Sequence, residues 1–216
     1  MQQIIHVEET DVRRRLAELG LESQALLEAL CRGYMALILS TPNYPPLYAS
    51  FAAWANTVCT LREYLTLQGW DRRDENNYSL IVDKRKEMAI AVSTGDEGTG
   101  RPDMNPTTKS SKGPNTVDAV TTDQLQLELP LGLPDNPVPV QPVHQKNRWV
   151  TWIFLVHWAM NEIRCELSLP VLIGDTARPS LWKERILLKP VPKDSALKII
   201  PSTLPSDIEV EIKRRA

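Results

Sequence analysis

Four carboxylates surround a predicted β-hairpin and the turn after it: Asp83, Glu87, Asp96 and Glu97. A metal-dependent nuclease needs carboxylates that converge on a divalent cation, often with a lysine nearby to steady the phosphate. Asp83 and Glu87, however, flank the basic residues 84–86, which is the ordinary composition of an exposed hairpin tip. A metal-dependent nuclease or related enzyme is therefore the alternative hypothesis, and we predict no metal site, no cofactor and no catalytic residue.

The segment after the hairpin is rich in glycine and then in threonine and serine. Residues 95–100 follow a predicted strand, as a phosphate-binding turn would, but their two carboxylates repel phosphate and no Gly-Lys-Ser/Thr ending follows. A mobile turn fits them better. Arg101, Lys109 and Lys112 could contact phosphate oxygens, although a flexible surface loop is the commoner meaning of this composition. We predict these three residues as binding residues on an exposed loop.

A short segment farther along resembles the peptide by which bacterial replication and repair proteins dock on the DNA sliding clamp. It runs over residues 124–129, a glutamine followed by spaced leucines. The resemblance implies that Gln124 anchors the peptide and that Leu127 and Leu129 enter an apolar pocket. The usual terminal phenylalanine is Leu129 here, and an alternating edge strand is the competing interpretation. A sliding clamp is thus one candidate partner.

Other reactive residue types lack the company that catalysis needs. His157 lies within a predicted apolar strand without an identifiable partner, and no serine or cysteine sits in a nucleophile elbow. The three cysteines, Cys31, Cys59 and Cys165, are far apart among apolar neighbours, which predicts reduced thiols in the core. The six tryptophans are predicted to be core residues rather than a platform for nucleic-acid bases.

Helical periodicity is confined to the N-terminal third. Apolar spacing predicts helices over residues 10–19, 23–39 and 47–69, with Gly20 and Gly69 as stop signals. In the third helix the steps of four and three predict one buried stripe, formed by Leu47, Phe51, Trp54, Val58, Leu61 and Leu65.

Alternation and β-branched residues mark the strands. The predicted hairpin pairs residues 78–83 with 88–93, and Trp70 is a candidate start for a further strand. The C-terminal strands are predicted over residues 149–158, 162–169, 181–188 and 208–212. The second of these alternates cleanly, which predicts a half-exposed antiparallel strand with Arg164, Glu166 and Ser168 outward.

A proline-rich segment divides the chain. Five prolines lie between Pro130 and Pro142, which favours a stiff, extended connector. The predicted organisation is a helical layer with hairpin and polar loop over residues 1–113, a linker over 114–147 and an antiparallel β meander over 148–216. The predicted fold class is α+β.

Charge and hydropathy limit the setting. The net charge is −2, and the basic excess of the C-terminal block is too small to indicate a nucleic-acid surface. The three consecutive arginines at 13–15 are predicted to be solvated, because acidic neighbours dilute their field. The start lacks a secretory pattern, and the longest apolar stretch is much shorter than the ~20 residues of a membrane helix. We predict a cytoplasmic protein without a membrane partner.

Over most of its length the chain resembles small uncharacterised proteins encoded by bacterial mobile elements. The resemblance rests on residues 94–100, 108–113, 165–170 and 182–186. It implies a genetic setting and no catalytic residue.

The leading hypothesis is a non-enzymatic interaction protein. Its partner would be a nucleic acid or a host protein, including DNA-metabolism machinery, contacted through the exposed central loop and the linker. The sequence leaves the oligomeric state open.

Overall fold

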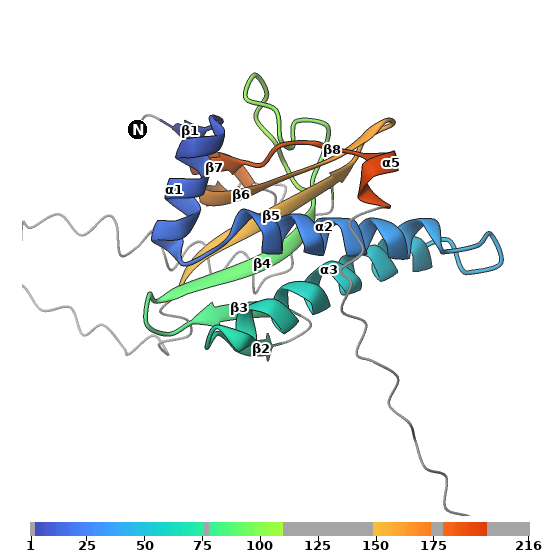
Figure 1. Ribbon diagram of the computed structural model, residues 1–216, viewed down its shortest axis with the longest axis horizontal. Coiled ribbons are helices and arrows are strands. Elements are labelled where there is room, and N and C mark those ends of the chain that lie inside the picture. Colours follow the sequence, from blue (N-terminus) through green and yellow to red (C-terminus); the bar gives the residue numbers. More distant parts are fainter. Residues whose placement is uncertain (1–2, 76–77, 110–148, 174–178, 198–216) are drawn as a thin grey trace, which may run out of the picture.

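The computed structural model describes residues 3–75, 78–109, 149–173 and 179–197. The chain builds helices first and strands afterwards, apart from a short N-terminal strand and a one-turn helix after the last strand (Figure 1). The helices are α1 (Glu9–Leu19), α2 (Ser23–Ile38), α3 (Tyr48–Leu67) and the one-turn α5 (Lys193–Ala196). The strands are β1 (Ile4–His6), β2 (Asp71–Glu75), β3 (Tyr78–Asp83), β4 (Met88–Thr94), β5 (Val150–Trp158), β6 (Glu162–Ile173), β7 (Pro179–Leu187) and β8 (Val191–Pro192).

All of these strands join one sheet. Their order is β1-β7-β6-β5-β4-β3-β2, and β8 pairs with the start of β6. The α+β class is confirmed, but the sheet is mixed, because β4 pairs with β5 and β1 pairs with β7 in parallel. The predicted hairpin and the predicted C-terminal strands therefore share one hydrogen-bonded sheet. The linker at 114–147 and the strand at 208–212 lie outside the described residues.

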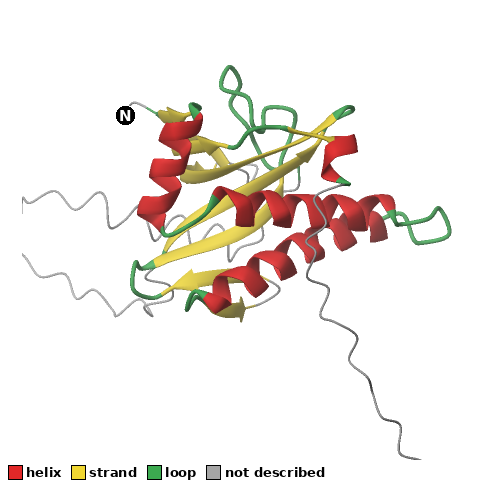
Figure 2. Cartoon of the chain, in the orientation of Figure 1, coloured by secondary structure: helices red, strands yellow, loops and turns green. Residues whose placement is uncertain are grey.

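The helices cover one face of the sheet (Figure 2). Their apolar side chains, such as Leu26, Leu30 and Leu61, pack on the inward residues of the central strands. Trp152, Phe154 and Val156 of β5 belong to this core, because alternate residues of a strand share one face. Burial of such side chains from water supplies the main stabilisation of the fold.

The face of the sheet away from the helices is also covered. Ile153 and Leu155 of β5 pack there with Trp182. The prediction that Arg164, Glu166 and Ser168 point to solvent on this face is wrong, because Arg164 is only 8% exposed and the other two are fully buried. A strand alternates in the same way whether its polar side faces water or a polar layer of protein.

Two glycines end helices as predicted. Gly20 and Gly69 have φ angles of 77° and 87°, a left-handed conformation that costs glycine little. After each of them the backbone folds back, and the amides of Leu21 and Trp70 donate to the carbonyls of Leu16 and Leu65.

The predicted buried stripe of α3 is only half correct. Val58, Leu61 and Leu65 are buried, whereas Leu47 is 82% and Phe51 61% exposed. The start of α3 extends past the sheet together with the end of α2 (Figure 1), whereas Trp54 one turn later reaches β4, where its Nε1 donates to the Val92 carbonyl at 3.2 Å. Periodicity identifies the apolar face of a helix but not how far its partner extends.

A glycine lets α2 and α3 approach closely. A Cβ atom on Gly33 would lie 2.1 Å from Thr57 Oγ1 and 2.9 Å from the Ala53 carbonyl oxygen. Gly33→Ala gains about 1 kcal/mol of helix propensity, but the overlap should cost about 1–3 kcal/mol. We therefore expect Gly33→Ala to lower the free energy of unfolding, as measured by urea denaturation. Adding Thr57→Ala should restore only part of this stability, because the Ala53 carbonyl oxygen still overlaps with the new Cβ atom. A Gly33→Ala protein that is more stable than wild type would contradict the close approach of the two helices.

No helix among the described residues combines the length and the apolar character that crossing a lipid bilayer requires.

Candidate functional site

The segment after β4, predicted to be the working surface, is fixed on the sheet. Residues 95–109 leave β4 and return to it, since the Lys109 amide donates to the Thr94 carbonyl at 3.0 Å. The Gly95 amide donates to the Val156 carbonyl at 2.9 Å. Thr99 and Thr108 are fully buried. The predicted mobile turn is therefore wrong for this segment, which we name the anchored loop.

A buried ion pair fastens the anchored loop from below. Arg185 of β7 lies diagonal to Glu166 of β6, and the two side chains are 1% and 0% exposed. Arg185 Nη2 lies 2.6 Å from Glu166 Oε2, and Nε lies 3.0 Å from Oε1. Such two-point contact between guanidinium and carboxylate is the strongest geometry for this pair.

The remaining donors and acceptors of the pair go to the loop. Arg185 donates to the carbonyls of Met104 and Arg101 at 2.7 and 3.0 Å. Glu166 accepts the Gly100 amide at 2.8 Å and the Ser168 hydroxyl at 2.7 Å. A buried charge pair is tolerable when its other hydrogen-bonding positions are filled, as they are here. The cluster therefore serves as a structural support.

The glycines of this loop serve packing rather than phosphate binding. Gly100 has a φ of 72°, and a Cβ there would lie 3.0 Å from the Arg164 Cβ. Its amide, which a phosphate would need, already donates to the Glu166 carboxylate. A phosphate at this turn would meet that carboxylate.

The predicted binding residues fall on both sides of the described boundary. Arg101 is exposed on the anchored loop, with its guanidinium 2.8 Å from the Asp103 carboxylate, and this partner lowers the pKa of the Asp103 carboxyl. Lys109 is exposed at the end of the loop. Lys112, Gln124, Leu127 and Leu129 lie outside the described residues, so their roles stay predictions.

The four carboxylates of the nuclease hypothesis are not brought together. Asp83 and Glu87 lie before β4, whereas Asp96 and Glu97 follow it. The seven residues of β4 separate the two pairs by roughly 20 Å at ~3.3 Å per residue. The described residues hold no group of three or more His, Cys, Asp or Glu that could bind a metal ion.

Asp83 has a local structural role instead. Its buried carboxylate accepts hydrogen bonds from the Arg85 amide and side chain at 2.9 and 3.2 Å. Burial opposes ionisation, but these hydrogen bonds outweigh it and hold the pKa of the Asp83 carboxyl below its usual value. The carboxylate thus stabilises the hairpin turn.

A second polar cluster, which the sequence patterns did not predict, lies on the helix side of β7. Glu184 accepts from Arg15 of α1 at 2.5 and 2.9 Å and contacts His6 Nε2 at 2.9 Å. His6 Nδ1 lies 2.5 Å from Asp11 Oδ2, so both ring nitrogens of His6 face carboxylates. The predicted solvated arginine cluster is correct for the exposed Arg13 and Arg14 but wrong for Arg15.

The reactive residue types have inert surroundings. His157 Nδ1 donates to the Gly95 carbonyl at 3.1 Å, and burial lowers the pKa of its imidazole. Cys31 and Cys165 are buried as predicted, and burial raises the pKa of the Cys31 thiol to about 11. Cys59 is exposed, contrary to the prediction. Neither thiol of the core is a nucleophile at neutral pH.

A groove lies at the edge of the sheet, between α1, the start of α2 and the anchored loop. Its volume is about 740 Å³. The apolar lining includes Val12 and Ala17 of α1, Leu27 of α2 and Leu188 after β7. Gly100 and Pro102 of the anchored loop form part of its wall.

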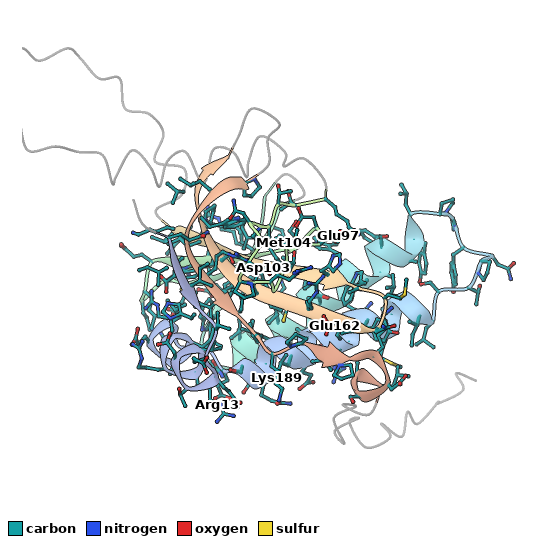
Figure 3. All side chains as sticks on the ribbon, turned by 90° about the horizontal axis from the view of Figure 1, so that it is seen from above. Arg13, Glu97, Asp103, Met104, Glu162 and Lys189 are labelled. Atoms are coloured by element: carbon teal, nitrogen blue, oxygen red, sulfur yellow. The ribbon has the colours of Figure 1, made fainter. Side chains whose placement is uncertain are left out.

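Charges of both signs border the groove. Figure 3 shows Arg13 of α1 and Lys189, after β7, on the same side of the molecule, and both line the groove together with Glu9 and Glu22. The Glu9 carboxylate accepts a hydrogen bond from Arg13, and the Glu22 carboxylate accepts one from Tyr64. The border therefore carries no concentrated charge of one sign.

The groove also follows an open stretch of sheet edge. β1 pairs with β7 only as far as His6 opposite Ile186. Residues 187–189 continue along β6, where the Leu188 amide donates to the Cys165 carbonyl. Among the described residues no strand lies on their other side. An extended peptide could continue the sheet at this edge while its side chains enter the groove.

The chain was compared with protein-family models, curated proteins and solved structures. None of them matches.

The groove was not predicted, because its residues come from four separate segments. In the sequence alone, nothing distinguishes Val12, Ala17 and Leu188 from ordinary helix and strand residues. One sequence signal was available: Lys189 and Pro190 end the strand of which Leu188 is the last apolar residue, and a proline there suits an unpaired edge.

Proposed function

We propose that this chain is a non-enzymatic interaction protein that binds an extended segment of a partner protein in the groove beside β7. The observation that carries the proposal is the apolar groove of about 740 Å³ beside an open sheet edge. Main-chain hydrogen bonds to the edge would supply affinity, and the apolar lining would select side chains at alternate positions.

Two features support a protein partner over a nucleic acid. The described arginines near the groove have carboxylate partners: Arg13 with Glu9, Arg15 with Glu184. Binding of a nucleic acid depends on basic side chains that are available to phosphates. The anchored loop also acts here as a rigid wall of the groove, whereas the sequence hypothesis made it the contact itself.

This proposal leaves two earlier hypotheses about the origin and the partner of the chain unchanged. An origin in a bacterial mobile element and a clamp-binding role for Gln124, Leu127 and Leu129 remain proposals.

A random-peptide library displayed on phage tests the groove. We expect wild-type protein to enrich peptides with apolar residues at alternate positions. Ala17→Trp, which fills the groove from an exposed position of α1, should raise the Kd of such a peptide at least about tenfold. Fluorescence polarisation with a labelled peptide measures the change.

Asn56→Trp is the matched control, because Asn56 is an exposed helical residue of α3 that does not line the groove. It should leave the Kd unchanged. Equal binding by wild type and Ala17→Trp would place the peptide elsewhere. Salt-dependent retardation of a DNA duplex, without enrichment of any peptide, would favour the nucleic-acid hypothesis instead.

A further inference from the structure

We propose that the tip of the α2–α3 hairpin, residues 38–51, is a self-association surface on which a second copy of this chain packs its own hairpin. The hairpin extends past the sheet, and in Figure 1 no other described segment lies at its tip. It lies at the opposite end of α2 from the groove, so the proposal does not rest on the groove.

Both helices of the hairpin carry their sheet-facing apolar stripes beyond the sheet. Along α3, Leu61 and Val58 are buried, Trp54 is partly exposed and Phe51 is exposed. Along α2 the same change runs from Leu30, which is buried, to Ile38, which is exposed. The stripe is continuous in the sequence, but Phe51 near its outer end is 61% exposed and has the ring of Trp54 as its neighbour. A second apolar layer would continue the core.

The tip carries no charged side chain. No Asp, Glu, Lys or Arg occurs between Arg32 and Arg62. In a two-fold symmetric contact each patch faces a copy of itself, so any concentrated charge meets the same charge. A patch without charge avoids this repulsion. The same feature offers no attraction to a charged partner such as a nucleic acid or an anionic membrane.

The tip exposes a large apolar area. Six large side chains of the tip are between 39% and 82% exposed: Ile38, Leu39, Tyr44, Leu47, Tyr48 and Phe51. Since large aromatic side chains bury roughly 150–250 Å² each, the six together expose on the order of 600 Å². That reaches the upper end of the largest patch on an ordinary monomer and approaches the roughly 800 Å² per partner of a stable interface.

The aromatic side chains of the tip already hold one another in place. The rings of Tyr44 and Tyr48 stack with centroids 4.0 Å apart, and Phe51 packs on Trp54 at 5.7 Å. Aromatic anchors that are already held in place lose little entropy when they bind. Small residues such as Ala49 and Ala52 lie between the large ones, so a second hairpin can approach closely. Two such hairpins would form a four-helix bundle.

Sedimentation equilibrium of the full chain tests the proposal. We expect wild-type protein to be dimeric at tens of micromolar, and Leu47→Glu to raise the dimer Kd about thirtyfold or more. Leu67→Glu is the matched control: Leu67 lies at the other end of α3 and is 89% exposed, so it receives the same change outside the tip. It should leave the dimer intact. Circular dichroism checks that both variants are folded.

Crosslinking gives an independent measurement. In a Cys59→Ser background, Ser50→Cys on the tip should form dimers with a short bismaleimide, whereas Thr66→Cys should not. Wild-type protein that stays monomeric at about 100 µM, well above the Kd of ordinary dimers, overturns the proposal. If the thiol introduced by Ser50→Cys is protected in a monomer, another segment of the same chain covers the tip and the proposal is wrong. Dimers that survive Leu47→Glu would place the interface elsewhere.

Discussion

Replacing Arg185 with methionine should lower the free energy of unfolding by about 3–5 kcal/mol, the usual cost of breaking a buried ion pair. The change leaves the Glu166 carboxylate without its guanidinium, in a place where neither side chain is more than 1% exposed. It also removes the donors to the Met104 and Arg101 carbonyls. Urea unfolding followed by circular dichroism measures the loss.

The same variant should release the anchored loop before the sheet unfolds. Hydrogen exchange should accelerate at the Gly100 amide, which donates to Glu166 in the wild type. Arg101→Met is the control, since Arg101 pairs with Asp103 at the surface and such pairs contribute about 1 kcal/mol or less. Equal stability of the Arg185→Met and Arg101→Met proteins would show that the buried pair does not hold the loop.

Glu184→Gln should cost about 2–4 kcal/mol at neutral pH, because it removes the charge that faces Arg15 and His6. Its effect should also depend on pH. Burial opposes ionisation of Glu184, but hydrogen bonds and charge from Arg15 prevail and hold the pKa of this carboxyl below its ordinary value of 4.5. The folded state therefore binds this proton less readily than the unfolded state.

The stabilisation from Glu184 is then fully present above the unfolded pKa of 4.5 and is lost as the pH falls through the lower folded pKa. Between about pH 5 and pH 3, we expect the stability of wild-type protein to fall more steeply than that of Glu184→Gln. Glu162→Gln, a change at an exposed position of β6, should follow the wild-type curve. Parallel curves for wild type and Glu184→Gln would show that the Arg15 contact is not maintained in solution.

The two clusters explain how one strand fixes both faces of the sheet. Glu184 and Arg185 are neighbours in β7, and successive side chains of a strand point to opposite faces. One holds α1, the other holds the anchored loop, and these two segments are walls of the groove. Loss of either cluster should therefore also weaken peptide binding in the groove.

The sequence by itself determined the long helices and the longer strands, but not β1, β8 or α5. The three helices, their glycine stops at Gly20 and Gly69, and the strands on both sides of the linker follow from periodicity and turn residues, which act within a few positions along the chain. The order of these elements along the chain likewise predicted the α+β class. These features depend on local backbone preference and on which residues avoid water.

Only the tertiary structure decided what the polar and apolar faces meet. Glu166 and Ser168 alternate like solvent-facing residues but are buried beneath a covering loop, and Phe51 continues a buried stripe but is exposed. The groove joins α1, α2, the anchored loop and the end of β7, which are far apart in the chain. The physical reason is that burial depends on all atoms that surround a side chain, most of which belong to segments distant in sequence, whereas a sequence pattern records only the side to which that side chain points.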